Sequence, residues 1–346
     1  MGDRVRVGLI GAGRIGGRHA RALASQVPGA ELVAVADANF AAARAAADEH
    51  RIGRATSDPA ALIADPTVEA VVIASSTASH APLIAAAAAA GKDVFCEKPI
   101  ALDLVATDAA LDAVAAAGIR LQIGFQRRFD AGYRRAREMV VAGALGRIEW
   151  IRDTMRDPAP PPRDYVATSG GLYRDMTAHN FDCVRWLLGE EVEELFAMGA
   201  ALVDPMFGEL GDVDTSVVSL RFAGGAIGAI DNGRRSGFGY DVRTEIFGSE
   251  GALLVGYARG TPLLHFSRDG VRSDHVEGFL DRFADAYVEE LRAFVVGVAT
   301  GSPTTPDGAD ARAALALAYA AETSLRERRP VSPACFGRGA AAGHPA

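Results

Sequence analysis

Residues 5–16 read Val-Arg-Val-Gly-Leu-Ile-Gly-Ala-Gly-Arg-Ile-Gly, an apolar run that passes directly into a cluster of glycines. The apolar part predicts a buried strand, and the residues after the glycines predict a helix through Ala24. The first 124 residues continue this alternation, with strands expected at 32–36, 70–74, 93–96 and 120–124 and helices at 40–50, 80–90 and 104–117. Such an order predicts a doubly wound, parallel α/β sheet.

The spacing of Gly11, Gly13 and Gly16 is typical of a dinucleotide-binding turn, in which glycines allow a tight bend and close approach of a pyrophosphate. The amides at the start of the following helix would bind the phosphates. Asp37 ends the second strand, where a carboxylate accepts hydrogen bonds from ribose hydroxyls and repels a 2′-phosphate. We therefore predict NAD rather than NADP, although Asp37 could be a simple turn residue. Arg14 could stack on adenine or contact a 2′-phosphate.

Small polar residues end the third strand, and Ser75 and Ser76 suit contact with the cofactor's phosphates or nicotinamide ribose. For Ser79 we favour capping of the next helix, which His80 is expected to begin.

The tripeptide Glu97-Lys98-Pro99 follows the fourth strand. A lysine at the carboxyl end of a central strand lies where open α/β sheets bind ligands, and the proline fixes the backbone beyond it. Taken alone, the tripeptide is common in surface loops; beside a dinucleotide turn it predicts a hydride-transfer site.

From Gly146 the sequence becomes rich in strands, and we expect a mostly antiparallel sheet with one exposed face. One helix, predicted at 175–188, interrupts the strands. We predict a Rossmann domain over residues 1–124, an α+β domain over 125–333 and a disordered tail over 334–346.

Asp175 and His179 are four residues apart, and so share a face of that helix. A carboxylate beside an imidazole orients it, as an acid/base group that takes a hydroxyl proton requires. An ordinary exposed pair is the alternative.

Together with the glycine turn and Glu97-Lys98-Pro99, the stretch Gly170-Gly-Leu-Tyr-Arg-Asp-Met-Thr-Ala-His179 resembles the Gfo/Idh/MocA oxidoreductase family. Arg156-Asp157-Pro158 and Gly239-Tyr240-Asp241 resemble its inositol branch. The resemblance covers roughly residues 4–330.

The resemblance implies an NAD-binding Rossmann domain, a C-terminal α+β domain with an open sheet, and a homotetramer joined through those sheets. It implies that Lys98 stabilises an alkoxide, His179 accepts the proton and Asp175 assists. Expected cofactor contacts are Gly11, Gly13, Arg14, Ile15, Gly16, Asp37, Ser75, Ser76, His80, Glu97, Lys98 and Arg127; expected polyol contacts are Lys98, Arg128, Asp157, Asp175, His179 and Tyr240. Asn180 departs from the aspartate expected in this branch, which leaves the preferred stereoisomer open.

Composition argues against several other classes. The net charge is −8, from 36 Lys+Arg against 44 Asp+Glu, which disfavours nucleic acid and anionic membranes as partners. The three cysteines, Cys96, Cys183 and Cys335, form neither a zinc pattern nor a disulfide framework. With a strand almost at the N-terminus and no long apolar run, we expect a cytoplasmic protein without a bound metal.

The leading hypothesis is NAD-dependent oxidation of a cyclitol, myo-inositol to its 2-keto product (scyllo-inosose). Another inositol isomer, or an aldopyranose oxidised at C1, is the alternative substrate. The alternative class of protein is a non-catalytic sensor of sugars or nucleotides. A sensor would not need Lys98, Asp175 and His179 in combination, because it performs no chemistry.

Overall fold

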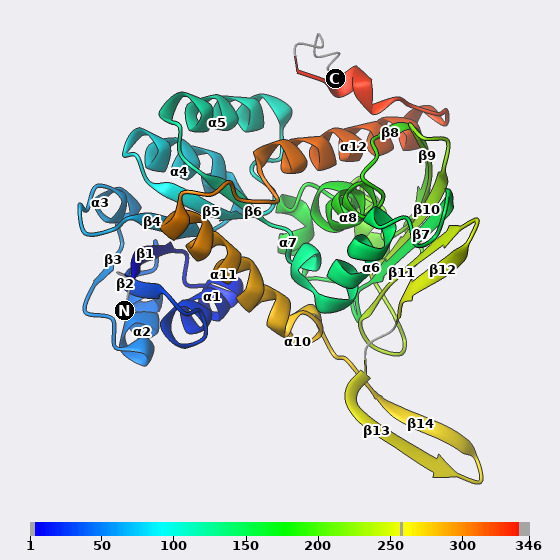
Figure 1. The fold of residues 1–346 in the computed structure, drawn as a ribbon, viewed down its shortest axis with the longest axis horizontal. Coiled ribbons are helices and arrows are strands. Elements are labelled where there is room, and N and C mark those ends of the chain that lie inside the picture. The colour runs from blue at the N-terminus through cyan, green and yellow to red at the C-terminus, as the bar shows by residue number, and fades with distance from the viewer. Residues whose placement is uncertain (1–3, 257–258, 339–346) are drawn as a thin grey trace. The chain divides into compact units, whose positions relative to one another are not determined.

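The computed structural model describes residues 4–256 and 259–338, which divide into two compact units (Figure 1). Unit 1 comprises the chain up to Phe129 together with Asp285–Ala313, and unit 2 comprises Asp130–Ala284 and the residues from Ala314 onward. Helix α12 (Gly308–Glu327) begins in the first unit and ends in the second. From the sequence we expected a single domain boundary at 124–125 and assigned residues 285–313 to the second domain, whereas they belong to unit 1.

Unit 1 is a Rossmann-like sheet of six parallel strands in the order β3-β2-β1-β4-β5-β6. The strands are β1 (Val5–Ile10), β2 (Ala30–Ala36), β3 (Ala55–Thr56), β4 (Ala70–Ile73), β5 (Asp93–Glu97) and β6 (Leu121–Gly124). The helices are α1 (Arg14–Ser25), α2 (Phe40–His50), α3 (Pro59–Ile63), α4 (Thr77–Ala89), α5 (Leu104–Ala117), the short 3₁₀ helix η1 (Gln126–Phe129) and α11 (Ala284–Thr300). The predicted parallel α/β sheet is confirmed.

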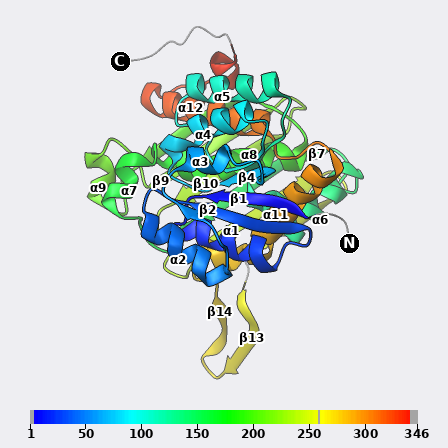
Figure 2. The ribbon, with the colours of Figure 1, turned by 90° about the vertical axis from the view of Figure 1, so that its left-hand side faces the viewer.

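Helices cover both faces of this sheet. Figures 1 and 2 show α4 and α5 on one face and α1, α2 and α11 on the other. Leu291 and Phe294 of α11 are fully buried against Val7 and Leu9 of β1 and Phe95 of β5. The late helix α11 therefore completes the core of the nucleotide-binding unit, which the local sequence pattern does not reveal.

Unit 2 contains a six-stranded sheet in the order β12-β11-β7-β10-β9-β8. Its strands are β7 (Ile148–Arg156), β8 (Val192–Ala200), β9 (Thr215–Phe222), β10 (Ile227–Gly233), β11 (Asp241–Gly248) and β12 (Gly251–Val255). The helices are α6 (Ala131–Val141), α7 (Arg163–Thr168), the π-helical turn η2 (Tyr173–Thr177), α8 (Ala178–Leu188), α9 (Pro205–Glu209), α10 (Phe279–Arg282) and the 3₁₀ helix η3 (Pro333–Phe336).

The pairing in this sheet is antiparallel except between β7 and β10, which run parallel. Parallel neighbours end at the same edge of a sheet, so the residues after β7 and after β10 lie side by side. One face of the sheet packs against helix α8, and exposed residues alternate with buried ones along β9, as predicted for a sheet with one open face.

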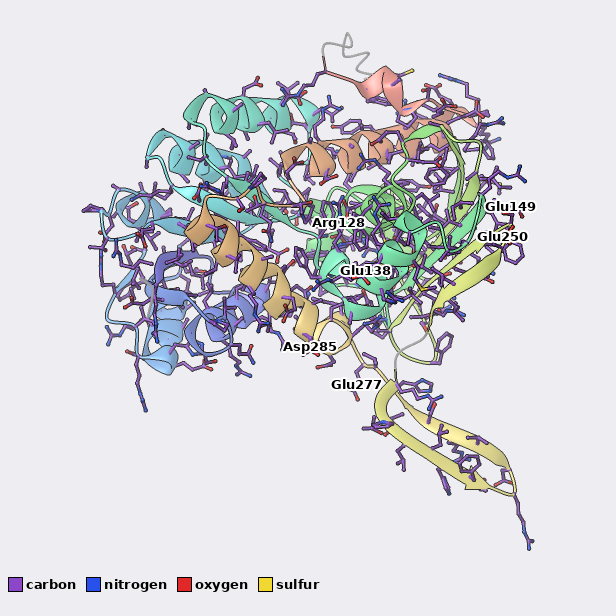
Figure 3. All side chains as sticks on the ribbon, in the orientation of Figure 1. Arg128, Glu138, Glu149, Glu250, Glu277 and Asp285 are labelled. Carbon is purple, nitrogen blue, oxygen red and sulfur yellow. The ribbon has the colours of Figure 1, made fainter. Side chains whose placement is uncertain are left out.

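Two segments were not anticipated. Strands β13 (Arg259–Ser267) and β14 (Gly270–His275) form a hairpin whose residues are almost all exposed, and Figure 3 shows its side chains projecting on both sides. In the predicted tail, Pro333–Phe336 form a helical turn, so the expected disorder is wrong for residues 334–336. The rest of the predicted tail from residue 339 lies outside the described residues.

Candidate active site

In the glycine-rich turn of unit 1, sterics require a glycine at two of the three positions, 11 and 16. Gly11 has φ +100°, and a Cβ there would lie 2.5 Å from the backbone of Ala74 and Ser75. A Cβ on Gly16 would lie 1.9 Å from the Gly11 carbonyl oxygen. At Gly13, by contrast, a Cβ would meet nothing within 4 Å, and no side chain caps α1 there. The helix start is thus open on the side where a pyrophosphate would approach.

Asp37 links the end of β2 to this turn. Its Oδ2 accepts a hydrogen bond from the Ala12 amide at 2.7 Å, and its Oδ1 accepts one from the Asn39 amide at 2.8 Å. Each carboxylate oxygen keeps a second lone pair for a ribose hydroxyl. The turn, the uncapped helix and this carboxylate together fit an adenine dinucleotide.

Ser75 and Ser76 lie beyond β4, and Ser76 is the N-cap residue of α4. The Ser75 hydroxyl is 2.6 Å from the Ser79 hydroxyl, which also donates to the Ser76 carbonyl. His80 lies within α4 and is buried; its ring nitrogens contact the carbonyl oxygens of Pro99 (2.8 Å) and Ser75 (3.0 Å). His80 thereby ties the turn after Lys98 to the end of β4. The predicted contact of His80 with the cofactor stays a prediction.

Glu97 ends strand β5 and Lys98 follows it; β5 lies between β4 and the edge strand β6 rather than at the centre of the sheet. The Glu97 carboxylate points inward, where its Oε1 accepts a hydrogen bond from His19 at 2.7 Å. The predicted contact of Glu97 with the cofactor stays a prediction. Lys98 is half-buried at the carboxyl end of the strand, as expected.

The predicted arginines lie in η1, just after β6. Arg127 is 2% exposed, and Arg128 forms a bidentate pair with Asp310, at 3.0 and 2.9 Å. Figure 3 labels Arg128 at this position. Because this pair fixes the Arg128 guanidinium, any contact with a polyol would use its remaining N–H groups.

In unit 2, a buried arginine joins the two predicted carboxylates. Arg234 donates to Asp157 Oδ2 at 3.1 Å and to Asp175 Oδ2 at 2.8 Å. The Tyr165 hydroxyl donates to the other oxygen of Asp175 at 2.8 Å. Both oxygens of Asp175 are therefore held in place, and one cation balances two carboxylates.

This cluster shifts the titration of its members. Burial alone would lower the pKa of Arg234, but Asp175 and then Asp157 raise it above the ordinary value. Burial and the neighbouring Asp175 also raise the pKa of Tyr165. Arg234 thus remains a cation, and Tyr165 remains a hydroxyl donor, at any working pH.

The predicted helix over 175–188 is divided. Asp175 lies in the π-helical turn η2, and His179 lies in the first turn of α8. Each is 8% exposed, so the pair is buried, and the alternative of an ordinary exposed pair is excluded. Wide helical turns of this kind often occur at functional sites.

Asn180, the residue that departs from the expected pattern, belongs to a buried hydrogen-bond chain. Its amide nitrogen donates to Asp153 at 2.8 Å, and its oxygen accepts from Asn232 at 3.0 Å. Asn232 also accepts from the Thr177 hydroxyl at 2.7 Å. Asn180 is 0% exposed. It therefore anchors the start of α8 to the sheet from below and presents no group to solvent.

Tyr240 is 2% exposed, with its ring edge-on to Phe279 and Phe283 at 6.4 and 6.5 Å between centroids. Tyr240 directly precedes strand β11 in the sequence. A direct contact between Tyr240 and substrate stays a prediction.

Sequence reasoning did not identify Arg234 and Tyr165. Arg234 follows β10 directly, just as Asp157 follows β7. Only the parallel pairing of these strands brings the two ends together, whereas the predicted antiparallel order would have separated them. The available signal was an arginine, Arg234, directly after the strand that ends in Asn232-Gly233. For Tyr165, in the short helix α7, we find no such signal.

The fold and the glycine-rich turn place the protein among the oxidoreductases that have a dinucleotide-binding domain. Residues 5–125 match the family described as "Oxidoreductase family, NAD-binding Rossmann fold", and residues 133–254 match the GFO/IDH/MocA C-terminal domain. The chain belongs to the Gfo/Idh/MocA oxidoreductase family, as the sequence motifs predicted.

Relatives and solved structures match nearly the whole chain. It is 45% identical to the myo-inositol 2-dehydrogenase of Thermotoga maritima, covering 94% of this chain and 98% of that protein. It is 43% identical to the inositol 2-dehydrogenase of Rhizobium meliloti, covering 95% and 99%. The structure of scyllo-inositol dehydrogenase from Lactobacillus casei with bound NAD(H) and scyllo-inositol matches with a TM-score of 0.91 at 29% identity, covering 96% and 100%.

Among the described residues, no helix combines the length and apolar character that a bilayer span requires.

Proposed function

We propose that the chain catalyses NAD-dependent oxidation of a secondary alcohol on a cyclitol ring, with myo-inositol as substrate and the 2-keto compound as product. The observation that carries this proposal is the hydrogen-bonded Asp157–Arg234–Asp175–Tyr165 cluster. Arg234 and Asp175 are buried in it, and Asp175 lies four residues before His179. It supplies fixed charges of both signs. A polyhydroxylated ring, whose hydroxyls donate and accept, needs such a site.

Oxidation of an alcohol removes a hydride from carbon and a proton from oxygen. Bound NAD supplies the hydride acceptor. We assign His179 as the group that takes the proton, with Asp175 as the fixed carboxylate that favours the charged imidazole. We assign Lys98 the hydrogen bond to the reacting oxygen, where an ammonium stabilises the developing alkoxide.

The basic residues of the chain favour this role for Lys98. The chain has two lysines, Lys92 and Lys98, and 34 arginines among its 36 basic residues. The Lys92 ammonium donates to the carbonyl oxygens of Asp65 and Val68, a structural use of a compact donor. In a chain that otherwise uses arginine, a lysine at the carboxyl end of β5 indicates a need for a compact amine at that place.

A second substrate is scyllo-inositol, which the Lactobacillus casei structure contains. The two cyclitols differ at one ring carbon, and Asn180 lies too deep to distinguish them directly. The deciding experiment follows NADH absorbance with purified protein, NAD and a panel of myo-inositol, scyllo-inositol, other cyclitols and glucose. We expect the highest kcat/KM with myo-inositol. Absence of NADH formation with every cyclitol would refute the proposal.

We also propose that the chain forms a homotetramer through the open face of the unit 2 sheet. Phe247, Trp150 and Ile227 are neighbours across β11, β7 and β10 on this face, and the first two rings stack at 5.9 Å. Phe247 is 41% exposed and Ile227 60% exposed. An apolar stripe of this kind marks a contact surface. The buried free cysteines Cys96 and Cys183 support our placement of the activity in the cytoplasm.

A further inference from the structure

A buried cluster in unit 1 lies directly behind the turn that carries Lys98. It consists of His19 on α1, Glu97 at the end of β5 and Glu290 on α11. The ligand-type atoms of the three side chains all lie within 4.8 Å of one another. His19 and Glu290 are 0% exposed. No part of the cofactor turn described above involves this cluster.

The fold makes room for these groups. A Cβ on Gly124 would lie 2.8 Å from Glu97 Oε2, so a glycine on β6 is what admits the carboxylate. The His19 ring packs edge-on against Phe95 and Tyr287, with centroids 5.4 and 6.0 Å away. The imidazole is therefore held in one orientation, with Nε2 directed at Glu97.

The chemistry of the cluster depends on which of the three side chains carry a proton. A carboxylate oxygen accepts, so His19 Nε2 carries a proton and donates it to Glu97 across 2.7 Å. Neither oxygen of Glu290 has a hydrogen-bond partner among the described residues. Burial and then the nearby Glu97 raise the pKa of Glu290 well above the ordinary value. A fully buried Glu290 beside the partly buried Glu97 cannot remain ionised without a neighbouring cation.

A metal ion is the other way to balance such a group, because a histidine and two glutamates can bind a divalent cation. A metal on His19 Nε2 would displace the proton that this nitrogen donates to Glu97, and the hydrogen bond would be lost. The hydrogen bond therefore favours a proton rather than a metal.

We propose that His19, Glu97 and a protonated Glu290 form a positioning triad that fixes the direction in which Lys98 is presented. Glu97 directly precedes Lys98, and Pro99 directly follows it. His19 holds Glu97, and His80 holds the Pro99 carbonyl oxygen. The backbone on both sides of the lysine is thus tied to buried imidazoles. This inference rests on the proposed catalytic role of Lys98.

The test compares Glu290→Gln with Glu290→Ala. A glutamine matches a protonated glutamic acid in size and charge, so we expect kcat at the wild-type level. Alanine leaves a cavity behind Glu97, and we expect kcat to fall about 10- to 100-fold, as for a small misplacement of a reacting group, with KM for NAD nearly unchanged. Glu289→Ala is the matched control, since Glu289 lies next to Glu290 but pairs with Arg292 on the helix surface.

A second readout does not depend on activity. With only two lysines, reductive methylation with ¹³C-formaldehyde gives resolved NMR signals for Lys92, Lys98 and the α-amino group. We expect the Lys98 signal to shift in Glu290→Ala but not in Glu290→Gln, while the Lys92 signal stays fixed in both. His19→Gln, which keeps a donor toward Glu97, and His19→Ala repeat the comparison if a Glu290 variant fails to fold.

Two results would overturn the triad. One is an unchanged kcat and an unchanged Lys98 signal in both alanine variants. The other is an equal loss in Glu290→Gln and Glu290→Ala, with a stoichiometric metal in the wild-type protein by elemental analysis. Lys98→Ala separates this outcome from the proposed function: full turnover without Lys98 would remove the lysine from the mechanism, while the NMR comparison would still report on the triad.

Discussion

At the scale of single residues, Asp37 and Arg234 show two roles of a charged side chain: Asp37 can bind a ligand, and Arg234 holds other side chains in place. Asp37 accepts two backbone amides and still has lone pairs for a ribose. Arg234 is buried, and its guanidinium donates to the carboxylates of Asp157 and Asp175. The first was predictable, because its place follows from a motif. The position of Arg234 was not, because its partners are distant in sequence: Asp157 follows β7 and Asp175 lies in η2.

Replacing Asp37 by serine should raise kcat/KM for NADP relative to NAD. The change removes the carboxylate that repels a 2′-phosphate. Initial rates with each cofactor measure the ratio. Asp58→Ser is the control, since Asp58 caps the nearby helix α3 by accepting from Ala60 and a serine can do the same. An unchanged ratio in Asp37→Ser would remove Asp37 from cofactor choice.

Replacing Arg234 by methionine should move the acidic limb of the kcat/KM profile to higher pH. Without the cation, the carboxylates of Asp157 and Asp175 repel each other, which favours protonation of one of them. The ionised form that assists His179 then appears only at higher pH. Arg235→Met, at the exposed neighbouring position, should leave the limb in place. An unmoved limb in Arg234→Met would show that Asp175 is not the group that titrates.

At the scale of elements, the division of one predicted helix into η2 and α8 is the most informative difference between sequence and structure. The periodicity of residues 175–188 is helical throughout and gives no sign of the wide turn. The turn is held by tertiary contacts: the Tyr173 hydroxyl bonds with Ser216 at 2.8 Å, and the Leu172 amide donates to Asp212 at 3.0 Å. Contacts of this kind come from distant strands, so a local pattern could not predict them.

The hydrogen-bond chain below α8 leads to a stability prediction for Asn180→Asp. The new carboxyl would face Asp153, and we expect a loss of about 1–3 kcal/mol in the free energy of unfolding. Because the folded variant would bind a shared proton more tightly than the unfolded chain, the loss should be small near pH 5 and grow toward pH 8.

Urea unfolding at the two pH values measures this difference. Asn39→Asp is the control, because Asn39 caps α2 at the surface and an aspartate caps equally well. An equal loss at both pH values would show that the two groups do not share a proton.

At the scale of the whole molecule, the sequence predicted both sheets but not how the chain returns. Continuous apolar strands that alternate with helices along the chain were enough to define the parallel sheet of unit 1. The return of α11 to that core depends on Leu291 and Phe294, which look like ordinary apolar residues of a surface helix until the fold is known. The hairpin β13–β14 was equally hidden, because its exposed strands lack the regular alternation of apolar and polar residues that marks a half-buried strand.

The open face of the unit 2 sheet predicts an oligomer that one charge can disrupt. Phe247→Asp places a carboxylate in the stripe with Trp150 and Ile227, and we expect a smaller particle than four chains of 36.1 kDa. Size-exclusion chromatography with light scattering measures the mass. Phe40→Asp, at a 52% exposed position in unit 1, should leave the assembly intact. A monomeric wild-type protein would refute the interface.

The most direct measurement is a crystal structure of the protein with NADH and myo-inositol bound. We predict that the Lys98 Nζ and a ring nitrogen of His179 both lie within hydrogen-bond distance of the same ring hydroxyl, next to C4 of the nicotinamide. A complex in which the inositol contacts only one of these side chains, or lies away from the nicotinamide, would contradict the account.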